Sequence, residues 1–280
     1  MKLIIHGGFF SESSKSDATK FAKQQSIKDI LTKAYSFLQH HSALETVVMA
    51  VELLENDPLF NAGIGSQIQN DGKIRMSASI MDGETKKFSG VINIQDIENP
   101  IRIAEKLLEV DDRVLGADGA LSFARANNFP AFNPEIPQRK KEYEAKLASK
   151  GLGTVGCVAL DKDGKIAAAT STGGKGFEIP GRISDSATIA GNFANEFCGV
   201  SCTGVGEDIV SGAVAAKIAI RVSDGFEIEK AFEKTFAELK PFDGFAGAIA
   251  IDHKGNIFHQ DSHPSMVYGS FDGVDFDIFG

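Results

Sequence analysis

The 280-residue sequence is poor in clustered positive charge and in long apolar runs. Lys and Arg total 29 against 38 Asp and Glu, a net charge of −9, so no basic stripe is available to neutralise nucleic-acid phosphates. The single basic cluster, Arg139-Lys140-Lys141, is followed at once by glutamate and is typical of a solvated face. No apolar run approaches the ~20 residues that a membrane-spanning helix needs. We therefore expect no nucleic-acid partner and no membrane partner.

Cysteine is also scarce, with only Cys157, Cys198 and Cys202 in the chain. An odd number of cysteines does not form a complete disulfide framework. The N-terminal residues 1–5 run straight into His6-Gly7-Gly8 without the apolar segment of a secretory signal. These features predict reduced thiols and a cytoplasmic location.

What is present is an ordinary globular composition, 42% hydrophobic and 24% charged, which permits a large buried core. The length fits one large layered domain or two small ones. Strands at both ends with helices grouped between them favour two sheets covered by helices. The pattern predicts strands at 2–6, 73–81 and 88–94, hairpins at 154–172 and 248–257, and helices at 21–41, 43–54 after an N-cap at Ser42, 99–110, 111–126, 207–222 and 228–239.

The hairpin at 154–172 is the most informative stretch. An apolar strand begins abruptly at Thr154 after Gly153, and a second strand ends at Thr172. If the loop has three residues centred on Asp163, Thr154 lies directly opposite Thr172, with both side chains on one face. A two-residue turn would shift this pairing by one residue.

Threonines in such strands are often ordinary β-formers. Thr154 acquires a chemical role if the peptide bond before it is cut. Its hydroxyl is then a nucleophile, and its new α-amino group, which titrates near ~7.7–8.0, is the adjacent base. Gly153 leaves room for the hydroxyl to attack the preceding carbonyl, and Thr172 could hydrogen-bond the attacking oxygen.

Several stretches of this sequence resemble the plant-type (class 2) L-asparaginases and isoaspartyl peptidases, N-terminal-nucleophile hydrolases with a threonine nucleophile. The resemblance spans nearly the whole chain. It is most specific around residues 154, 172, 182 and 203. The matching stretches are 5–8, 54–66, 77–83, 153–161, 169–174, 181–186 and 201–207.

The resemblance implies an α+β fold, the four-layer αββα sandwich of the N-terminal-nucleophile hydrolases. It implies a single hydrolase domain, 1–280, that cuts itself between Gly153 and Thr154 into an alpha segment, 1–153, and a beta segment, 154–280. The expected activity is cleavage of the side-chain amide of L-asparagine and of isoaspartyl peptides, without a cofactor for catalysis. The expected assembly is a homodimer of processed protomers.

Arg182 and Asp185 suit an amino-acid substrate, because a guanidinium binds an α-carboxylate and a carboxylate binds an α-ammonium. The simpler reading of the two residues is a surface ion pair. The segment Thr203–Glu207 has small residues and free amides before a helix, which is typical of an oxyanion or carboxylate site, with phosphate binding as an alternative. The resemblance implies that Thr203 and Gly204 stabilise the oxyanion, and that Gly206 and Asn61 contact substrate.

The loop around Gly63 and Gly65 has few side-chain donors, so its carbonyls could surround a cation, or it could be a tight loop without an ion. The resemblance implies a structural sodium ion held by main-chain carbonyls. A catalytic metal at His259, Asp261 and His263 is the weaker alternative, since these residues do not lie on a helix. The expected sodium ligands are the carbonyls of Leu54, Glu55, Asp57, Phe60, Ala62 and Ile64.

The sequence also departs from the family pattern near the expected pocket. Such changes affect substrate preference and the rate of self-cleavage. Alternatives are a glycosylasparaginase-like or protein-cleaving relative, which Gly173-Gly174 disfavours, or a poorly maturing member that binds aspartate-like ligands without turnover. The departures lie at Phe9, Phe10, Phe177, Glu178, Ser184, Ala187 and residues 260–266.

Overall fold

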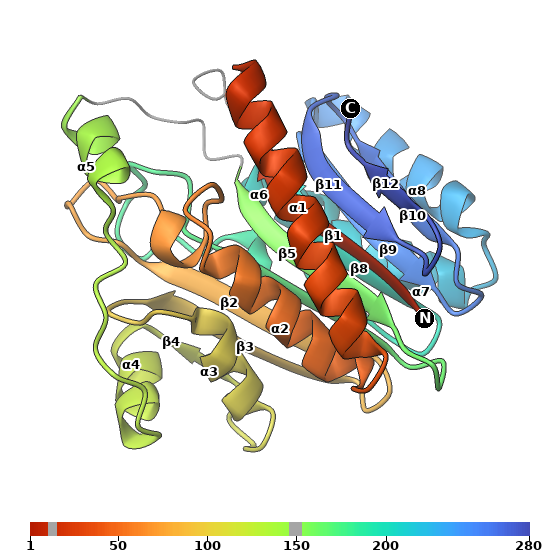
Figure 1. Ribbon diagram of the computed structural model, residues 1–280, viewed down its shortest axis with the longest axis horizontal. Helices are drawn as coiled ribbons and strands as arrows, with labels where there is room; N and C mark the ends of the chain where they lie inside the picture. The colour runs from red at the N-terminus through yellow and green to blue at the C-terminus, as the bar shows by residue number, and fades with distance from the viewer. Residues whose placement is uncertain (11–15, 146–152) are drawn as a thin grey trace.

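The computed structural model describes residues 1–10, 16–145 and 153–280; residues 146–152 of the expected alpha segment fall outside these ranges. Figure 1 shows the arrangement of helices and strands. The helices are α1 Asp17–Leu38, α2 Ala43–Glu55, α3 Pro100–Leu107, α4 Ala117–Ala126, α5 Pro137–Glu144, α6 Gly206–Gly212, α7 Val214–Ser223 and α8 Ile228–Ala237. The strands are β1 Lys2–Phe9, β2 Met76–Asp82, β3 Lys87–Ile94, β4 Val114–Gly116, β5 Thr154–Leu160, β6 Ile166–Thr172, β7 Asn192–Ala194, β8 Cys198–Gly204, β9 Ala246–Asp252, β10 Ile257–Asp261, β11 Met266–Phe271 and β12 Phe276–Ile278.

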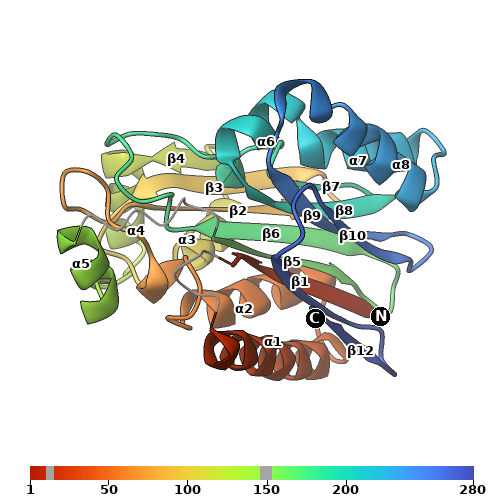
Figure 2. The same cartoon turned by 90° about the horizontal axis from the view of Figure 1, so that it is seen from above.

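The strands form two stacked sheets. One has eight strands in the order β12-β11-β1-β5-β6-β2-β3-β4, and the other has four in the order β10-β9-β8-β7. Figure 2 shows the layers edge-on, with α1 and α2 along one outer face and α6 to α8 along the other. This is the four-layer αββα sandwich, so the predicted fold class is confirmed.

Alternation along β5 explains why the layers bury three separate cores. Val155 and Cys157 point into the core under α1 to α3, whereas Val158 and Leu160 point into the core between the sheets. Val200 and Cys202 of β8 face the third core, under α6 to α8. Because successive strand residues face opposite sides, residues 154 and 156 share the inter-sheet side with Val158.

Local sequence signals account for the elements that carry the site. Asp161 accepts bonds from the amides of Asp163 and Lys165 and so closes the predicted turn. The resulting register places Thr154 opposite Thr172, which confirms the three-residue loop and excludes the two-residue turn. Ser42 and Glu45 form a reciprocal capping box at the start of α2, and the N-cap prediction is also confirmed.

Two predicted helices were wrong in part. Residues 114–116 of the expected helix at 111–126 instead add β4 in parallel to β3, because pairing at a sheet edge overrides local helix preference. The expected helix at 207–222 is divided into α6 and α7 by Ala213, whose φ of +48° is left-handed.

No helix among the described residues is long and apolar enough to cross a membrane.

Ala213 generates a stability prediction. A left-handed conformation costs a residue with a Cβ about 1 kcal/mol, and glycine adopts it freely. We expect Ala213→Gly to leave the free energy of unfolding unchanged or to raise it by up to about 1 kcal/mol, measured by denaturant titration. The matched control Ala22→Gly, inside right-handed α1, should lower it by about 1 kcal/mol. Equal losses for both variants would contradict the left-handed assignment.

Candidate active site around Thr154

Thr154 and Thr172 face each other at the end of the central hairpin. Thr154 is the first residue of β5 and Thr172 the last residue of β6. The Thr154 hydroxyl donates to Thr172 Oγ1 at 3.1 Å, and Thr172 Oγ1 also accepts from the Gly174 amide at 3.3 Å. Both side chains are about 95% buried, at 5% and 4% exposure. The pairing therefore holds two hydroxyl groups together in a largely water-free position.

The residues before Thr154 pass close to Asn61. A Cβ on Gly153 would lie 2.7 Å from Asn61 Cβ, so no larger residue fits there. Asn61 donates from Nδ2 to the Gly174 carbonyl at 2.6 Å and accepts from the Gln67 amide at 2.9 Å. These bonds join the loop after α2 to the segment after Thr172. Asn61 thus lies beside the proposed cleavage site, and its contact with substrate stays a prediction.

His6 lies against the other side of Thr154, and the sequence interpretation included it in the matching stretch 5–8 but assigned it no chemical role. Its Nδ1 is 3.0 Å from the Thr154 carbonyl oxygen, and its Nε2 is 2.9 Å from Ser201 Oγ of the opposite sheet. Burial lowers the pKa of His6 to about 3, although the bond to the Thr154 carbonyl opposes that shift. The imidazole is therefore neutral at physiological pH. The available signal was a histidine that interrupts the apolar run Leu3-Ile4-Ile5.

Arg182, Asp185 and Gly206 converge at the start of α6. A Cβ on Gly206 would lie 2.8 Å from Arg182 Nη2 and 2.9 Å from Asp185 Oδ1. Asp185 is fully buried, and burial raises the pKa of its carboxyl to about 7, against the opposing effect of Arg182. Its Oδ2 has no hydrogen-bond partner among the described residues. The structure thus brings together a cation and a buried carboxyl group with one oxygen that has no protein partner among the described residues.

Arg182 has a carboxylate partner that the sequence interpretation did not assign. Glu207 accepts from Arg182 Nε and Nη2, both at 2.9 Å, and from Lys175 Nζ at 3.2 Å. Burial favours a neutral Arg182, but Glu207 and the neighbouring carboxylates outweigh burial and raise the pKa of Arg182. The bond to Arg182 lowers the pKa of Glu207 to about 2. This pair fixes the direction of the guanidinium.

Thr203 and Gly204 end β8, and alternation along the strand places Thr203 on the same face as Ser201, toward the large sheet. Thr203 Oγ1 is buried and has no hydrogen-bond partner within the described part of the chain. Gly204 has a φ of +140°, and a Cβ there would lie 2.5 Å from the Phe245 carbonyl oxygen, so only glycine fits. A buried hydroxyl left without a partner is costly unless a ligand or water supplies one. Thr203 therefore has an unused hydrogen-bonding group at this position, and its contact with substrate stays a prediction.

Glu178 is a buried carboxylate at the position where the sequence departs from the family pattern. One oxygen lies 3.3 Å from the Lys175 amide and 3.4 Å from Gln69 Nε2. The other has no hydrogen-bond partner in the described ranges. Glu178 and Arg182 also line a recess together with Lys175, Phe177, Ile179, Pro180, Gly181 and Glu207.

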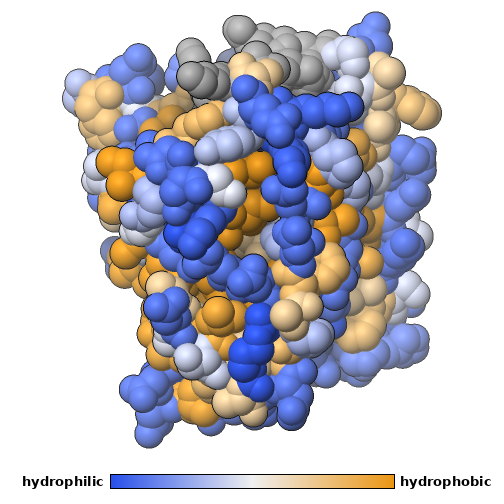
Figure 3. All heavy atoms as spheres, turned by 90° about the vertical axis from the view of Figure 1, so that its left-hand side faces the viewer, coloured by the Kyte–Doolittle hydropathy of each residue, from blue (hydrophilic) through white to orange (hydrophobic). Residues whose placement is uncertain are grey.

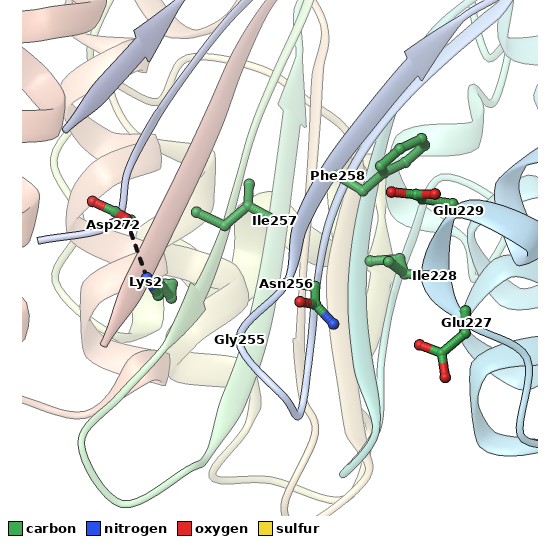
Figure 4. A pocket seen from close by; sticks show the side chains of 9 residues that line it. All are labelled: Lys2, Glu227, Ile228, Glu229, Gly255, Asn256, Ile257, Phe258 and Asp272. Carbon is green, nitrogen blue, oxygen red and sulfur yellow. Dashed lines mark hydrogen bonds and ion pairs between the residues drawn. The ribbon is translucent and has the colours of Figure 1, made fainter. Parts of the chain in front are cut away.

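Figure 3 shows the side of the molecule that carries α5 and the neighbouring loops, where apolar atoms are visible between polar side chains. A second recess lies at the other end of β5 from Thr154, because its lining residue Lys2 is paired with Leu160, the last residue of β5. Figure 4 shows its lining, in which Lys2 and Asp272 form an ion pair at 3.3 Å. Its lining contains no nucleophile beside a base, so it is the weaker candidate for an active site.

The loop after α2 presents carbonyl oxygens toward its two glycines. A Cβ on Gly63 would lie 2.2 Å from the Glu55 oxygen, and one on Gly65 would lie 1.8 Å from the Phe60 oxygen. The Asp57 and Ala62 carbonyls each accept one amide bond, from Phe60 and Gly65, and each keeps a second lone pair, whereas the Leu54 carbonyl accepts from the amides of both Asn56 and Asp57. An oxygen-only set of this kind suits a hard cation such as sodium. The residues present therefore fit the expected ion.

The described residues contain no group of three or more His, Cys, Asp or Glu side chains placed to hold a metal. His263 stacks on Phe245 with ring centroids 4.4 Å apart, and His259 packs on Tyr268 at 3.7 Å. The two histidines are engaged by separate aromatic partners. The geometry therefore does not support the alternative metal site at His259, Asp261 and His263.

Comparison with known proteins agrees with this geometry. The chain matches the family described as asparaginase over residues 1–145 and 135–277. It is 46% identical to an isoaspartyl peptidase/L-asparaginase of Synechocystis sp. over 95% of this chain and 86% of the relative. It is 36% identical to an isoaspartyl peptidase of Escherichia coli over 91% of this chain and 88% of the relative. It is 34% identical to a plant-type L-asparaginase of Thermococcus kodakarensis over 98% and 97% of the two chains. The chain therefore belongs to the asparaginase family.

Proposed function

We propose that this protein is a self-processing amidohydrolase that cleaves the side-chain amide of L-asparagine and the β-aspartyl bond of isoaspartyl peptides. The observation that carries the proposal is the buried hydroxyl pair of Thr154 and Thr172. Thr154 directly follows Gly153, a position where no residue with a side chain fits. The names of the relatives, isoaspartyl peptidase and L-asparaginase, supply the substrate class.

The proposed maturation begins when Thr154 Oγ attacks the Gly153 carbonyl carbon. The bond from that carbon to the Thr154 nitrogen breaks, the nitrogen takes up a proton, and an ester links Gly153 to Thr154 Oγ. Water then hydrolyses the ester, which leaves a carboxylate on Gly153 and a free amine on Thr154. Segments 1–153 and 154–280 would stay associated, because β5 and β6 of the second lie between β1 and β2 of the first.

In the proposed turnover, Arg182 binds the substrate α-carboxylate and ionised Asp185 binds its α-ammonium. The Thr154 amine accepts the hydroxyl proton as Oγ attacks the substrate carbonyl, and Thr203 with Gly204 stabilises the oxyanion. The leaving group, ammonia or a peptide amine, departs with that proton. Water attacks the resulting ester in the same way and releases aspartate.

We further propose a reduced, cytoplasmic setting and a dimer of processed protomers. Cys157, Cys198 and Cys202 are buried free thiols in the structure, which supports the first part. The dimer rests on the family resemblance, and its test is the mass of the native protein in solution.

The nucleophile generates the first functional prediction. We expect Thr154→Ala to stay a single chain on a denaturing gel and to lose at least about a thousandfold in kcat/KM for asparagine. Thr172→Val keeps the shape of the side chain but removes its hydroxyl, and kcat should fall about a hundredfold. Thr154→Ser should retain self-cleavage.

Other outcomes distinguish the alternatives. A parent protein that binds aspartate but releases no ammonia from asparagine would be a binding protein. Preferential hydrolysis of glycosylated asparagine would favour the glycosylasparaginase-like alternative.

Asp185 generates a pH prediction. Its raised pKa, about 7, means that the carboxyl gains a proton and loses its affinity for an ammonium as the pH falls through 7. KM for asparagine should therefore rise below about pH 7, whereas Asp185→Asn should have a high KM at every pH. The exposed Asp118→Asn should behave like the parent. A parent KM that does not change between pH 5.5 and 8 would contradict this role.

The carbonyl loop generates a prediction about ion removal. Replacing sodium in the buffer by tetramethylammonium should lower the Tm by about 2–4 °C, since a ligand of the native state adds roughly 1 kcal/mol or more to stability. Gly65→Ala should abolish this sodium effect, because its Cβ would lie 1.8 Å from the Phe60 oxygen. Gly119→Ala meets no atom within 4 Å and serves as the control. A Tm that is independent of sodium would exclude the ion.

A further inference from the structure

A row of buried polar side chains lies directly behind the nucleophile, in the space between the two sheets. His6 of β1 is paired with Gly156 of β5, and Gly156 is paired with Thr170 of β6. Thr154 and Thr172 occupy the next row on the same face of the sheet. Within the described residues, His6, Thr170 and Ser201 are all 0% exposed. The row is therefore built into the core and separated from solvent.

Gly156 makes the row possible. A Cβ at this position would lie 2.0 Å from Ser201 Oγ and 2.4 Å from His6 Nε2. The Ser201 hydroxyl of the small sheet thus occupies the space where a side chain on β5 would otherwise lie. It reaches both His6 Nε2, at 2.9 Å, and Thr170 Oγ1, at 2.6 Å. One serine therefore joins the two sheets at the row next to Thr154.

The Thr154 carbonyl at one end of the row fixes the direction of these bonds. The Thr154 carbonyl can only accept, so the proton of His6 must be on Nδ1, 3.0 Å away. A neutral imidazole then has a lone pair on Nε2, which must accept from the Ser201 hydroxyl. Thr170 in turn donates to Ser201 Oγ. The result is one ordered chain of donors from Thr170 through Ser201 and His6 to the Thr154 carbonyl.

The β1–β5 pairing ends at His6 and Gly156, so Thr154 precedes the last paired residue of β5 and has no partner on β1 in this pairing. The imidazole supplies a donor to the Thr154 carbonyl at that point, and this restrains the peptide unit that carries the nucleophile. We infer that His6, held in its Nδ1–H tautomer by the Thr154 carbonyl and by Ser201, is a positioning residue that sets the orientation of the Thr154 hydroxyl and amine. This inference rests on the proposed function of Thr154, but the tautomer can be tested without it.

The first test reads the tautomer of His6 directly. In protein labelled with ¹⁵N-histidine, long-range ¹H–¹⁵N spectra should show one histidine, absent from His6→Asn, that is protonated on Nδ1 and unprotonated on Nε2. In the Ser201→Ala protein the Thr154 carbonyl should keep the proton on Nδ1, but the Nε2 resonance should shift, because Nε2 no longer has a donor. A parent His6 that is protonated on Nε2 or on both nitrogens would overturn the inference.

The second test separates positioning from folding. His6→Leu has no donor, and we expect kcat to fall about a hundredfold with KM within twofold of the parent, because Arg182 and Asp185 still hold the substrate. His6→Asn places an amide donor near the position of Nδ1, and its kcat should be about tenfold higher than that of His6→Leu. Thr170→Ser keeps the terminal hydroxyl and should exceed Thr170→Val in kcat.

His41→Asn is the matched control, because His41 Nδ1 also bonds a main-chain carbonyl at 3.0 Å, but on the surface. This variant should have the kcat and KM of the parent. Parent-like kcat in folded His6→Leu, or no gain from His6→Leu to His6→Asn, would overturn the positioning role. A parent inactive on asparagine and isoaspartyl peptides would instead refute the proposed function, and the tautomer result would stand.

Discussion

The site depends on the pairing of β5 with β6, which sets Thr154 opposite Thr172 at the end of a hairpin buried on both faces. One step of slippage would turn one of the two threonines toward the helices. The turn at Asp161–Lys165 and the two flanking strands prevent such slippage. β1 and β2 lie on either side of the hairpin, so its position is fixed by hydrogen bonds along both edges.

This constraint connects maturation to stability. If the chain is cut after Gly153, the new terminus remains the first residue of a strand at the centre of an eight-stranded sheet. The two segments share the core beneath α1 and α2 and the core between the sheets. Breaking one peptide bond at the head of β5 removes none of these contacts, so the site can gain an amine without losing its geometry.

The parts of this arrangement that follow from short-range chemistry were predictable from the sequence. The turn residues predicted the hairpin and left two registers, of which the structure has the one with a three-residue loop, and Ser42 predicted the start of α2. The contact between His6 and Ser201 could not be predicted in this way, because the two residues lie on different sheets and meet only through the space left at Gly156. The Arg182–Glu207 pair and the left-handed Ala213 likewise depend on tertiary packing. Glu178 was recognised as a departure, but its burial beside Gly174 is visible only in the structure.

The central claim is that a mid-chain threonine becomes an N-terminal residue with its own base. Its most direct measurement is peptide mapping of the purified, active protein after chemical labelling of α-amino groups. The account predicts a labelled amine on Thr154 and a free carboxylate on Gly153. Peptides that run unbroken through residues 153 and 154, in a preparation that hydrolyses asparagine, would contradict it.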